Sequence, residues 1–415
     1  MMKLLWLCNI LPGEVKEKVT GKPGSGLWMD HVLSDLRKLP GVTIHILCPS
    51  PVAAEGQLDE NCSFATFQPK LPYEYLPELE VRFRKELKAF QPDVIHSWGV
   101  EYAHTLAMVN AAEAEGFLDH MAVSIQGLCG FIAQHYLEGI PASVCSGFTF
   151  RDFLRQDNLR QQQKKFLRRG ALEQQTLRKV HHVIGRTHWD KACTMLVNPG
   201  CQYHVCRETL RQEFYEGQWQ YENCRKHTVF APGCSYPVKG FHHMLEAFAL
   251  VKKAYPDAVL TVPGDSVFSG SALRQQSYQR YLKKLMEKYD LHGSIQFLGK
   301  LSADGMKQAY LDANVFAMPS TIENSPNSMG EAMLLGVPCV AADVGGVTTM
   351  MTHDKEGYVY QSTAPYMLAH YIEQVFAMGA DAASIGLAAR SHARKTHDPE
   401  TNLRDLMTIY QTIGK

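Results

Sequence analysis

The sequence lacks most of the features that mark specialised classes of protein. Its 415 residues contain no C-x-x-C pair, and its eleven cysteines are odd in number and scattered. In a chain of this size, that pattern indicates reduced thiols rather than a disulfide framework. Cys201, His204 and Cys206 lie close enough in sequence to suggest a metal, but no second pair of ligands follows at zinc-finger spacing. We therefore expect no metal.

Neither charge nor hydropathy favours a nucleic-acid-binding or membrane-spanning protein. Lys plus Arg and Asp plus Glu both number 42, so the formal net charge is zero and no global basicity is available to hold a polyanion. No run of about 18 apolar residues occurs. The segment Met1–Ile10 has one lysine and no small-residue cleavage site, which favours a first strand over a signal peptide. We expect a soluble, cytoplasmic protein with no nucleic-acid partner.

Two common nucleotide-binding motifs are also absent. No Gly-Lys-Ser/Thr phosphate loop occurs, which excludes a P-loop enzyme. Gly24-Ser25-Gly26 comes too late after the first apolar run for a dinucleotide fingerprint, lacks its third glycine and has no acidic partner about 20 residues on. A nicotinamide-dependent dehydrogenase is therefore disfavoured.

Short apolar runs alternate with helical patterns from end to end, which predicts buried parallel sheets and an α/β fold. Because the runs form two series, the simplest architecture is two Rossmann-like domains in tandem. The predicted strands are Leu4–Cys8, Val42–Cys48, Val94–His96, Ala122–Ile125 and His182–Ile184, then Thr228–Ala231, Ala258–Val262, Ile295–Leu298, Val315–Met318, Pro338–Ala342 and Tyr358–Tyr360.

The break between the two series falls between Asn198 and Arg225, where the chain turns polar and aromatic without a clear strand. We expect a first domain over residues 1–205 and a second over 206–390. Asp398 followed by Pro399 is a helix-start signal, and an apolar stripe follows it. Residues 391–415 are therefore predicted to form a helix that returns to the first domain.

The stretch from Met318 to Met333 carries the most chemical information. A predicted strand ends at Pro319, a turn-rich loop follows, and a helix begins near Asn327 or Ser328, either of which can act as its cap. A helix N-terminus at the carboxyl end of a parallel strand is suited to bind phosphate. Glu323 in the loop and Glu331 within the helix can accept hydrogen bonds from sugar or ribose hydroxyls.

Lys239 is the cation expected at the same sheet edge. It stands after the strand Thr228–Ala231 and at the start of an amphipathic helix whose stripe is Phe241, Met244, Leu245, Phe248 and Val251. A lysine beside two helix N-termini is suited to a diphosphate, although Lys239, Glu323 and Glu331 taken singly could equally be ordinary surface residues.

Together with further short motifs, these residues make the chain resemble the family 4 glycosyltransferases. These are GT-B enzymes that mostly act with retention and use nucleotide sugars. Any one piece is weak, but their order along the chain is specific. They are Lys239-Gly240, Pro263-Gly264-Asp265, Ile295-Gln296-Phe297-Leu298-Gly299, Met318-Pro319-Ser320, Glu323-x7-Glu331-Ala332-Met333, Gly336-Val337-Pro338 and Asp343-Val344-Gly345-Gly346, with Pro92–Gly99 and Gly24–Gly26 in the first half.

The resemblance implies a role for each of these residues at the donor. Glu331 would hold the ribose hydroxyls, Glu323 would contact the donor sugar, and Lys239 would neutralise the diphosphate. Backbone N–H groups around Asn327 and Ser328 would assist Lys239, and Lys300 and Leu301 would lie beside the base.

The resemblance also extends to the first half of the chain. The loop Gly24, Ser25 and Gly26 would approach the phosphates. Gln126 occupies a place where many relatives have a histidine facing the transferred sugar, and we expect Gln126 and His96 to contact substrate. The implied fold is GT-B, with its two domains facing a central cleft.

Three departures place the chain in a divergent subgroup. The family usually has an arginine where Cys234 stands, a Phe-Gly-Leu where Ser325-Pro326-Asn327 stands, and a Pro-Glu where Thr348-Thr349 stands. Binding of the diphosphate is therefore expected to depend more on Lys239 and the helix termini. The donor is also harder to identify from the sequence.

The implied activity is transfer of a hexose from a nucleoside-diphosphate sugar to a hydroxyl of a glycan or lipid-linked saccharide, with retention, in polysaccharide or glycoconjugate biosynthesis. No D-x-D pair occurs, so we expect no metal and no cofactor. A phosphorylase-like or epimerase-like enzyme and a non-catalytic sugar-nucleotide-binding protein stay open as alternatives.

Residues 151–191 are locally basic, with eleven Lys and Arg against four Asp and Glu, and aromatic residues interrupt the charges. Two interpretations stay open. The stretch is a solvated helix that packs on the first domain, or it is a peripheral contact with anionic lipid on the inner face of the cell membrane.

Overall fold

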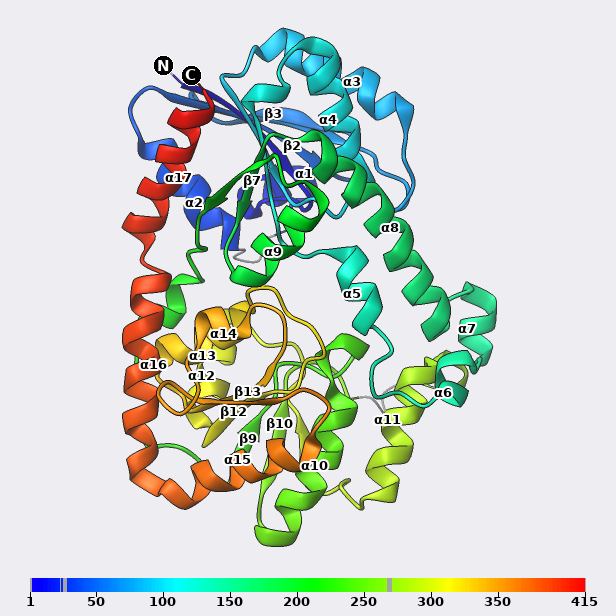
Figure 1. Ribbon diagram of the computed structural model, residues 1–415, viewed down its shortest axis with the longest axis vertical. Coiled ribbons are helices and arrows are strands. Elements are labelled where there is room, and N and C mark those ends of the chain that lie inside the picture. The colour runs from blue at the N-terminus through cyan, green and yellow to red at the C-terminus, as the bar shows by residue number, and fades with distance from the viewer. Residues whose placement is uncertain (1, 23, 25–27, 267–270, 415) are drawn as a thin grey trace. The chain divides into compact units, whose positions relative to one another are not determined.

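The computed structural model describes residues 2–22, 24, 28–266 and 271–414. These residues form two compact units (Figure 1). Unit 1 comprises Met1–Phe131, Lys165–Arg211 and His397–Lys415, and unit 2 comprises Ile132–Lys164 and Gln212–Thr396. Each unit is an α/β structure built around one mainly parallel sheet, as the alternation of apolar runs and helices predicts.

The sheet of unit 1 has eight strands in the order β3-β4-β2-β1-β5-β6-β7-β8. Every described pairing is parallel except that of the edge strand β3 with β4. The chain leaves β1 toward β2 on one side and returns to β5 on the other, so β1 and β5 flank the switch point of the sheet. The strands are β1 Met2–Cys8, β2 Val42–Pro49, β3 Glu55–Asp59, β4 Cys62–Phe67, β5 Val94–Trp98, β6 Met121–Ser124, β7 His182–Gly185 and β8 Gln202–Val205.

Apolar residues cover both faces of this sheet. Leu5 and Leu7 of β1 join one buried cluster, while Leu4 and Trp6 join the other, because alternate side chains of a strand point to opposite faces. Helices pack on these two clusters. They are α1 Gly13–Thr20, α2 Trp28–Lys38, α3 Pro77–Phe90, α4 Ala103–Glu115, α9 His188–Val197 and α17 Pro399–Ile413.

The C-terminal helix α17 belongs to unit 1. The Asp398 side chain accepts a hydrogen bond from the Thr401 N–H at 2.8 Å, so Asp398 is the N-cap and Pro399 the first helical residue, as predicted. Leu406 and Tyr410 are buried against β1, and the Tyr410 hydroxyl accepts a hydrogen bond from Trp6 Nε1 at 3.1 Å.

The sheet of unit 2 has six parallel strands in the order β11-β10-β9-β12-β13-β14. β9 and β12 are neighbours from which the chain proceeds in opposite directions across the sheet. The gap beyond their carboxyl ends is therefore the switch point, where α/β sheets place ligands. The strands are β9 Thr228–Phe230, β10 Val259–Val262, β11 Ile295–Phe297, β12 Val315–Met318, β13 Cys339–Asp343 and β14 Tyr358–Gln361.

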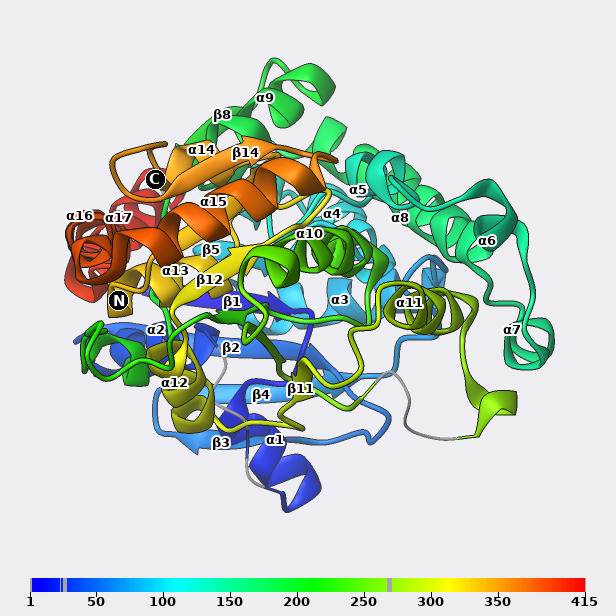
Figure 2. The same cartoon turned by 90° about the horizontal axis from the view of Figure 1, so that it is seen from below.

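Helices cover the sheet of unit 2 on both faces. α15 packs over β12, β13 and β14 and against α10, while α13 packs against α16 (Figure 2). The helices are α10 Phe241–Ala254, α11 Ser277–Lys288, α12 Ala303–Asp312, α13 Asn327–Leu335, α14 Val347–Met350, α15 Pro365–Met378 and α16 Ala382–Thr396.

One segment lies in a different unit from the one the sequence predicted. Residues 132–164 were placed in the first domain, but they belong to unit 2. The chain passes between the units within α5 Cys129–His135 and α8 Leu159–Lys179, and the segment also contains α6 Ala142–Ser146 and α7 Phe150–Arg155. Hydrogen bonds hold it there, including His242 Nε2 to the Glu138 carbonyl at 2.9 Å and the Ser277 N–H to Asp152 Oδ2 at 2.9 Å. Helical periodicity shows which face of a helix is buried, not which sheet buries it.

Candidate functional site

The switch point of unit 2 brings two loops together. One loop follows β9 and ends at Lys239 and Gly240, and the other follows β12 from Pro319. Gly240 adopts a left-handed φ of 65°, and a Cβ built on it would lie 1.8 Å from the Pro319 carbonyl oxygen. Only glycine allows the two loops this close an approach. The start of α10 therefore lies directly beside the loop that leads to α13.

Lys239 and Glu323 meet across these loops in an ion pair. Lys239 Nζ donates to Glu323 Oε1 at 2.6 Å, and the Ser320 hydroxyl donates to the same oxygen at 2.7 Å. The Glu323 side chain is 11% exposed and that of Lys239 is 35% exposed. The carboxylate is therefore mostly enclosed, while the ammonium group keeps access to a ligand. The sequence predicted both residues at one sheet edge but not their direct contact.

The helix α13 begins at Asn327 with an uncapped first turn. Its N-cap is Pro326, and no side chain makes a capping hydrogen bond, so the prediction that Asn327 or Ser328 is the cap was wrong. As the first helical residues, Asn327 and Ser328 instead contribute backbone N–H groups to the positive end of the helix dipole. Glu331 lies further along α13 and is 5% exposed.

The Gly345-Gly346 turn supports the Glu323 backbone. The Gly346 N–H donates to the Glu323 carbonyl at 3.0 Å, and a Cβ on Gly345, whose φ is 52°, would lie 1.9 Å from that carbonyl oxygen. The family-like Gly-Gly pair therefore fixes the loop that carries the carboxylate.

Lys300 and Leu301 follow β11 at the same edge of the sheet. Gly264 and Gly299 exchange two backbone hydrogen bonds at 2.7 and 3.1 Å, which draws the turn after β11 against the loop after β10. Lys300 is exposed beyond this bridge, while Leu301 is partly buried. Unit 2 thus gathers at one edge all the residues predicted to bind the donor from the second half of the chain.

A cavity in unit 1 lies at the carboxyl ends of β5, β6 and β7. It contains both residues predicted to contact substrate, His96 and Gln126. Its lining is Val32, His96, Trp98, Ser124, Ile125, Gln126, Ile184, Arg186, Cys206, Arg207, Glu208, Asn402 and Leu406. The sequence analysis missed Arg186 and Glu208, each of which follows a strand of the sheet.

The His96 side chain forms hydrogen bonds with other residues of unit 1. Its Nδ1 hydrogen-bonds with the Tyr410 hydroxyl at 2.7 Å and its Nε2 with the Ser124 hydroxyl at 2.6 Å, and the residue is 1% exposed. Burial lowers the pKa of His96 to about 3, so its ring is neutral at physiological pH. Both ring nitrogens are thus occupied within unit 1, and contact of His96 with substrate stays a prediction.

The glycine loop after β1 is described only in part. Gly24 lies against the backbone of Gly13, since a Cβ on Gly24 would lie 2.3 Å from the Gly13 Cα. The Gly13 N–H in turn donates to Asp30 Oδ1 at 2.8 Å. The other two residues predicted to approach the phosphates, Ser25 and Gly26, lie outside the described residues.

The cysteines and histidines near residue 201 form no metal centre. Across residues 2–22, 24, 28–266 and 271–414, no group of three or more His, Cys, Asp or Glu side chains is arranged to hold a metal ion. His204 Nε2 instead hydrogen-bonds with His182 Nδ1 at 3.0 Å.

The basic stretch 151–191 divides into paired and exposed charges. Arg169 stacks over Tyr102, and Lys179 bonds Asn110 at 2.9 Å. In unit 2, by contrast, Arg155, Arg160 and Lys164 are exposed. No helix within the described residues is long and apolar enough to cross a membrane.

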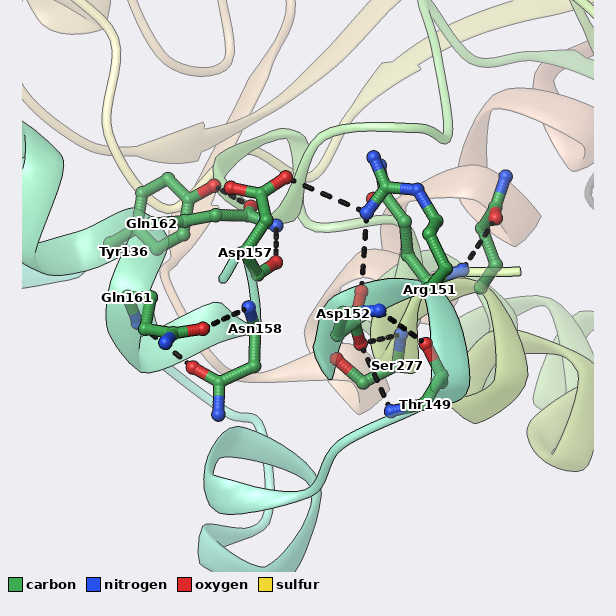
Figure 3. A network of polar contacts seen from close by, with 11 residues as sticks. Tyr136, Thr149, Arg151, Asp152, Asp157, Asn158, Gln161, Gln162 and Ser277 are labelled. Carbon is green, nitrogen blue, oxygen red and sulfur yellow. Dashed lines mark hydrogen bonds and ion pairs between the residues drawn. The ribbon is translucent and has the colours of Figure 1, made fainter. Parts of the chain in front are cut away.

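The short helix α7 in this stretch is firmly held while its outer side chains face solvent. Asp152 is fully buried and receives the Ser277 N–H, and Arg151 bonds Asp152 at 3.2 Å and contacts Asp157 at 3.5 Å (Figure 3). Thr149 caps the helix reciprocally with Asp152. Four large apolar side chains nevertheless stay more than half exposed on and beside α7, namely Phe148, Phe150, Phe153 and Leu154.

Comparisons with known proteins show which family the second half of the chain resembles. Residues 222–392 match the family described as glycosyl transferases group 1. A D-inositol 3-phosphate glycosyltransferase of Corynebacterium urealyticum is 26% identical over 176 residues, which are 42% of this chain and 41% of that protein. An uncharacterized glycosyltransferase of Bacillus subtilis, YqgM, is 25% identical over 185 residues, which are 45% of this chain and 49% of that protein. The chain thus spans less than half the length of these two relatives.

Solved structures resemble the whole chain in fold. Sucrose-phosphate synthase from Thermosynechococcus elongatus superposes with a TM-score of 0.72 at 16% identity, covering 99% of both chains. The Anabaena protein HepE, in a complex with UDP and glucose, superposes with a TM-score of 0.68 at 17% identity, covering 99% of this chain and 100% of that chain. These likenesses establish the GT-B fold, with two Rossmann-like domains.

Proposed function

We propose that this chain, whose residues 222–392 form a domain of the glycosyl transferases group 1 family, transfers a hexose from a nucleoside-diphosphate sugar to a hydroxyl acceptor with retention of configuration. The observation that carries the proposal is the grouping of Lys239, Glu323 and the uncapped start of α13 at the switch point of unit 2. A cation, a carboxylate and free N–H groups at one sheet edge match the diphosphate and hydroxyls of such a donor.

Each residue has a distinct task in this proposal. The diphosphate binds Lys239 and the N–H groups of Asn327 and Ser328. Glu331 accepts from the ribose hydroxyls, and Glu323 accepts from hydroxyls of the donor sugar. Because Lys239 Nζ donates to Glu323 Oε1, the cation that binds the diphosphate and the carboxylate that binds the sugar lie side by side. Lys300 and Leu301 lie beside the base.

The chemistry requires stabilisation of a leaving group more than a strong nucleophile. Breaking the sugar–phosphate bond leaves negative charge on the nucleotide and positive charge on the sugar ring. Lys239 and the α13 dipole are oriented before reaction to stabilise that negative charge. In the retaining course, the acceptor hydroxyl approaches on the face that the nucleotide leaves, and the departing phosphate oxygen takes its proton. The proposal invokes no metal or cofactor, since the sequence has no D-x-D pair.

Release of nucleoside diphosphate tests this function. The purified protein is incubated with UDP-, GDP- and ADP-sugars, with and without a panel of simple saccharide and lipid-linked acceptors. We expect one donor to release free nucleoside diphosphate in an acceptor-dependent manner and the product anomer, assigned by NMR coupling, to keep the donor's configuration. UDP-glucose is the first donor to try, because HepE forms a complex with UDP and glucose. Binding of a nucleotide sugar without turnover would instead indicate a sensor.

We further propose a cytoplasmic protein that contacts anionic membrane through α7 and the start of α8, where a lipid-linked acceptor is held. The exposed apolar side chains on α7 adjoin a groove lined by Phe150, Leu154, Arg155, Leu273 and Arg274. Because buried hydrogen bonds fix α7, its exposed apolar side chains are held in place for docking. The exposed basic residues beside them complement anionic head groups.

Reversing three exposed charges should abolish this membrane contact. Each basic residue near an anionic surface contributes about 1 kcal/mol, so Arg155→Glu, Arg160→Glu and Lys164→Glu together should lower partitioning by about 100-fold or more. Sedimentation with phosphatidylglycerol-containing vesicles measures it. A matched triple reversal at exposed lysines elsewhere, Lys253, Lys284 and Lys355, should change partitioning far less. Absence of sedimentation by the unmodified protein would refute the contact.

A further inference from the structure

Three polar side chains form a buried chain of contacts in the cavity of unit 1. Arg186 stands after β7, Glu208 after β8, and Gln126 after β6. Arg186 Nη2 donates to Gln126 Oε1 at 3.1 Å and to the Ile125 carbonyl at 2.6 Å, while its Nη1 pairs with Glu208 Oε2. The side chains of Arg186 and Glu208 are 7% and 8% exposed. The guanidinium therefore connects the carboxylate to the amide.

The backbone at both ends of the ion pair is held by side chains. The Arg186 N–H donates to Asp190 Oδ2 at 3.0 Å, and Asp190 also forms a reciprocal cap with Thr187 at the start of α9. On the other side, Nδ1 of His397 donates to the Glu208 carbonyl at 2.7 Å. Two buried side chains, those of Asp190 and His397, thus fix the backbone of the two residues that form the ion pair.

A buried ion pair adds little to stability in comparison with well-packed apolar residues, because both charges must be desolvated. Within the pair, the Glu208 carboxylate compensates the charge of the Arg186 guanidinium. It is placed against Gln126, which the sequence analysis predicted to contact substrate. Stability alone therefore does not explain an arginine and a glutamate at these positions. A role in orienting the neighbouring Gln126 amide does explain them.

An arginine has only donors, so the amide atom that faces it must be the oxygen. With Oε1 of Gln126 held by Arg186, the –NH₂ group is the part of the side chain left to contact a ligand. An unrestrained glutamine could present either group. We propose that Arg186 and Glu208 are positioning residues that lock Gln126 as a neutral hydrogen-bond donor toward an oxygen of the sugar substrate. This inference rests on the proposed function.

The locked amide differs from a histidine at the same place. It cannot change charge near neutral pH, and it offers only donors to the ligand. Arg186 is neutralised by Glu208, and His96 in the same cavity is neutral and occupied. The Gln126 amide group therefore suits a hydroxyl or ring oxygen of the sugar substrate.

A double-mutant cycle on turnover tests the inference. Gln126→Ala should lower kcat by about 100-fold, the scale of loss for a misplaced or missing positioned contact. Arg186→Lys keeps the charge beside Glu208 but loses the planar fork, and should lower kcat by about 10-fold. If Arg186 acts through Gln126, adding Arg186→Lys to Gln126→Ala should lower kcat less than twofold further. Glu208→Gln provides a second route to the same result should Arg186→Lys fail to fold.

Several readouts separate this inference from its premise. Nucleoside diphosphate affinity should stay within threefold in all variants, and Arg178→Lys, an exposed substitution on α8, should leave kcat unchanged. Gln126→Glu, which can still accept from Arg186 but offers no donor, should be as slow as Gln126→Ala. Multiplicative losses in the double variant, or a Gln126→Glu variant with normal kcat, would overturn the positioning role while the function stands. An unmodified protein without transfer would remove both.

Discussion

Replacing Glu323 by glutamine should reduce kcat by about 10² to 10³-fold while changing nucleoside diphosphate affinity less than threefold. Glu323 Oε1 receives both Lys239 Nζ at 2.6 Å and the Ser320 hydroxyl at 2.7 Å, and an amide cannot satisfy both an ammonium group and the sugar hydroxyls as a carboxylate does. A loss of this size matches removal of one oriented electrostatic contact to the transition state. Steady-state kinetics and isothermal titration with the nucleotide measure the two quantities.

Glu331→Gln should instead lower nucleoside diphosphate affinity more than it lowers kcat. Its carboxylate is proposed to hold the ribose, which is bound alike in ground and transition states, so affinity should fall by about tenfold or more with a smaller effect on kcat. Glu287→Gln, an exposed change on α11, is the control and should alter neither. If both Glu323→Gln and Glu331→Gln retain normal rates and affinities, the donor site is assigned to the wrong edge of the sheet.

The strands of the fold could be predicted because they are buried. Each of the eleven predicted apolar runs overlaps an observed strand, since parallel strands covered on both faces appear as continuous apolar segments. The three strands that were missed lie toward or at the edges of the eight-stranded sheet. β3 is polar and partly exposed, and β8 has no buried residue, so the main chain pairs there without a hydrophobic signal.

The sequence predicted which edge of the sheet carries the site, but not the contacts between the side chains there. Residues at the carboxyl ends of β9 and β12 had to be neighbours once the sheet was parallel, which placed Lys239 and Glu323 together. Their ion pair depends on side-chain rotamers and on the approach of Gly240 to Pro319, which no spacing encodes. The cap of α13 was wrong because Pro326 already occupies the N-cap position.

Arg186 and Glu208 could not be assigned to the site from the sequence either. They lie 22 positions apart in sequence and belong to no recurrent motif, so nothing local links them to Gln126. The one available signal was their placement: each is a charged residue within three positions of the end of a strand, at the carboxyl edge where ligands bind. Buried charge at that edge is detectable only after the sheet order is known.

Two buried histidines should make unit 1 less stable as the pH falls below 6.5. Burial lowers the pKa of both His96 and His104 to about 3, with Arg169 assisting at His104, against an ordinary value of 6.5. Below pH 6.5 the unfolded chain therefore binds protons that the folded chain does not. The free energy of unfolding then falls as pH decreases from 6.5 toward 3, by up to about 1.4 kcal/mol per pH unit for each histidine.

Glu173 opposes the two histidines, because burial raises its pKa to about 8 and its protonation in the folded protein adds stability as the pH falls. From pH 7.5 to pH 5, the two histidines themselves should lower the free energy of unfolding by about 4 kcal/mol. Urea denaturation at the two pH values, followed by tryptophan fluorescence from Trp6 and Trp98 beside His96, measures this loss. His104→Gln, whose amide can still bond Asn9, should remove about 2 kcal/mol of destabilisation between pH 7.5 and pH 5 relative to the unmodified protein. The exposed His370→Gln should leave the pH dependence unchanged. If His104→Gln and the unmodified protein show the same change in the free energy of unfolding between the two pH values, the ring of His104 is protonated in the folded protein and the prediction is wrong.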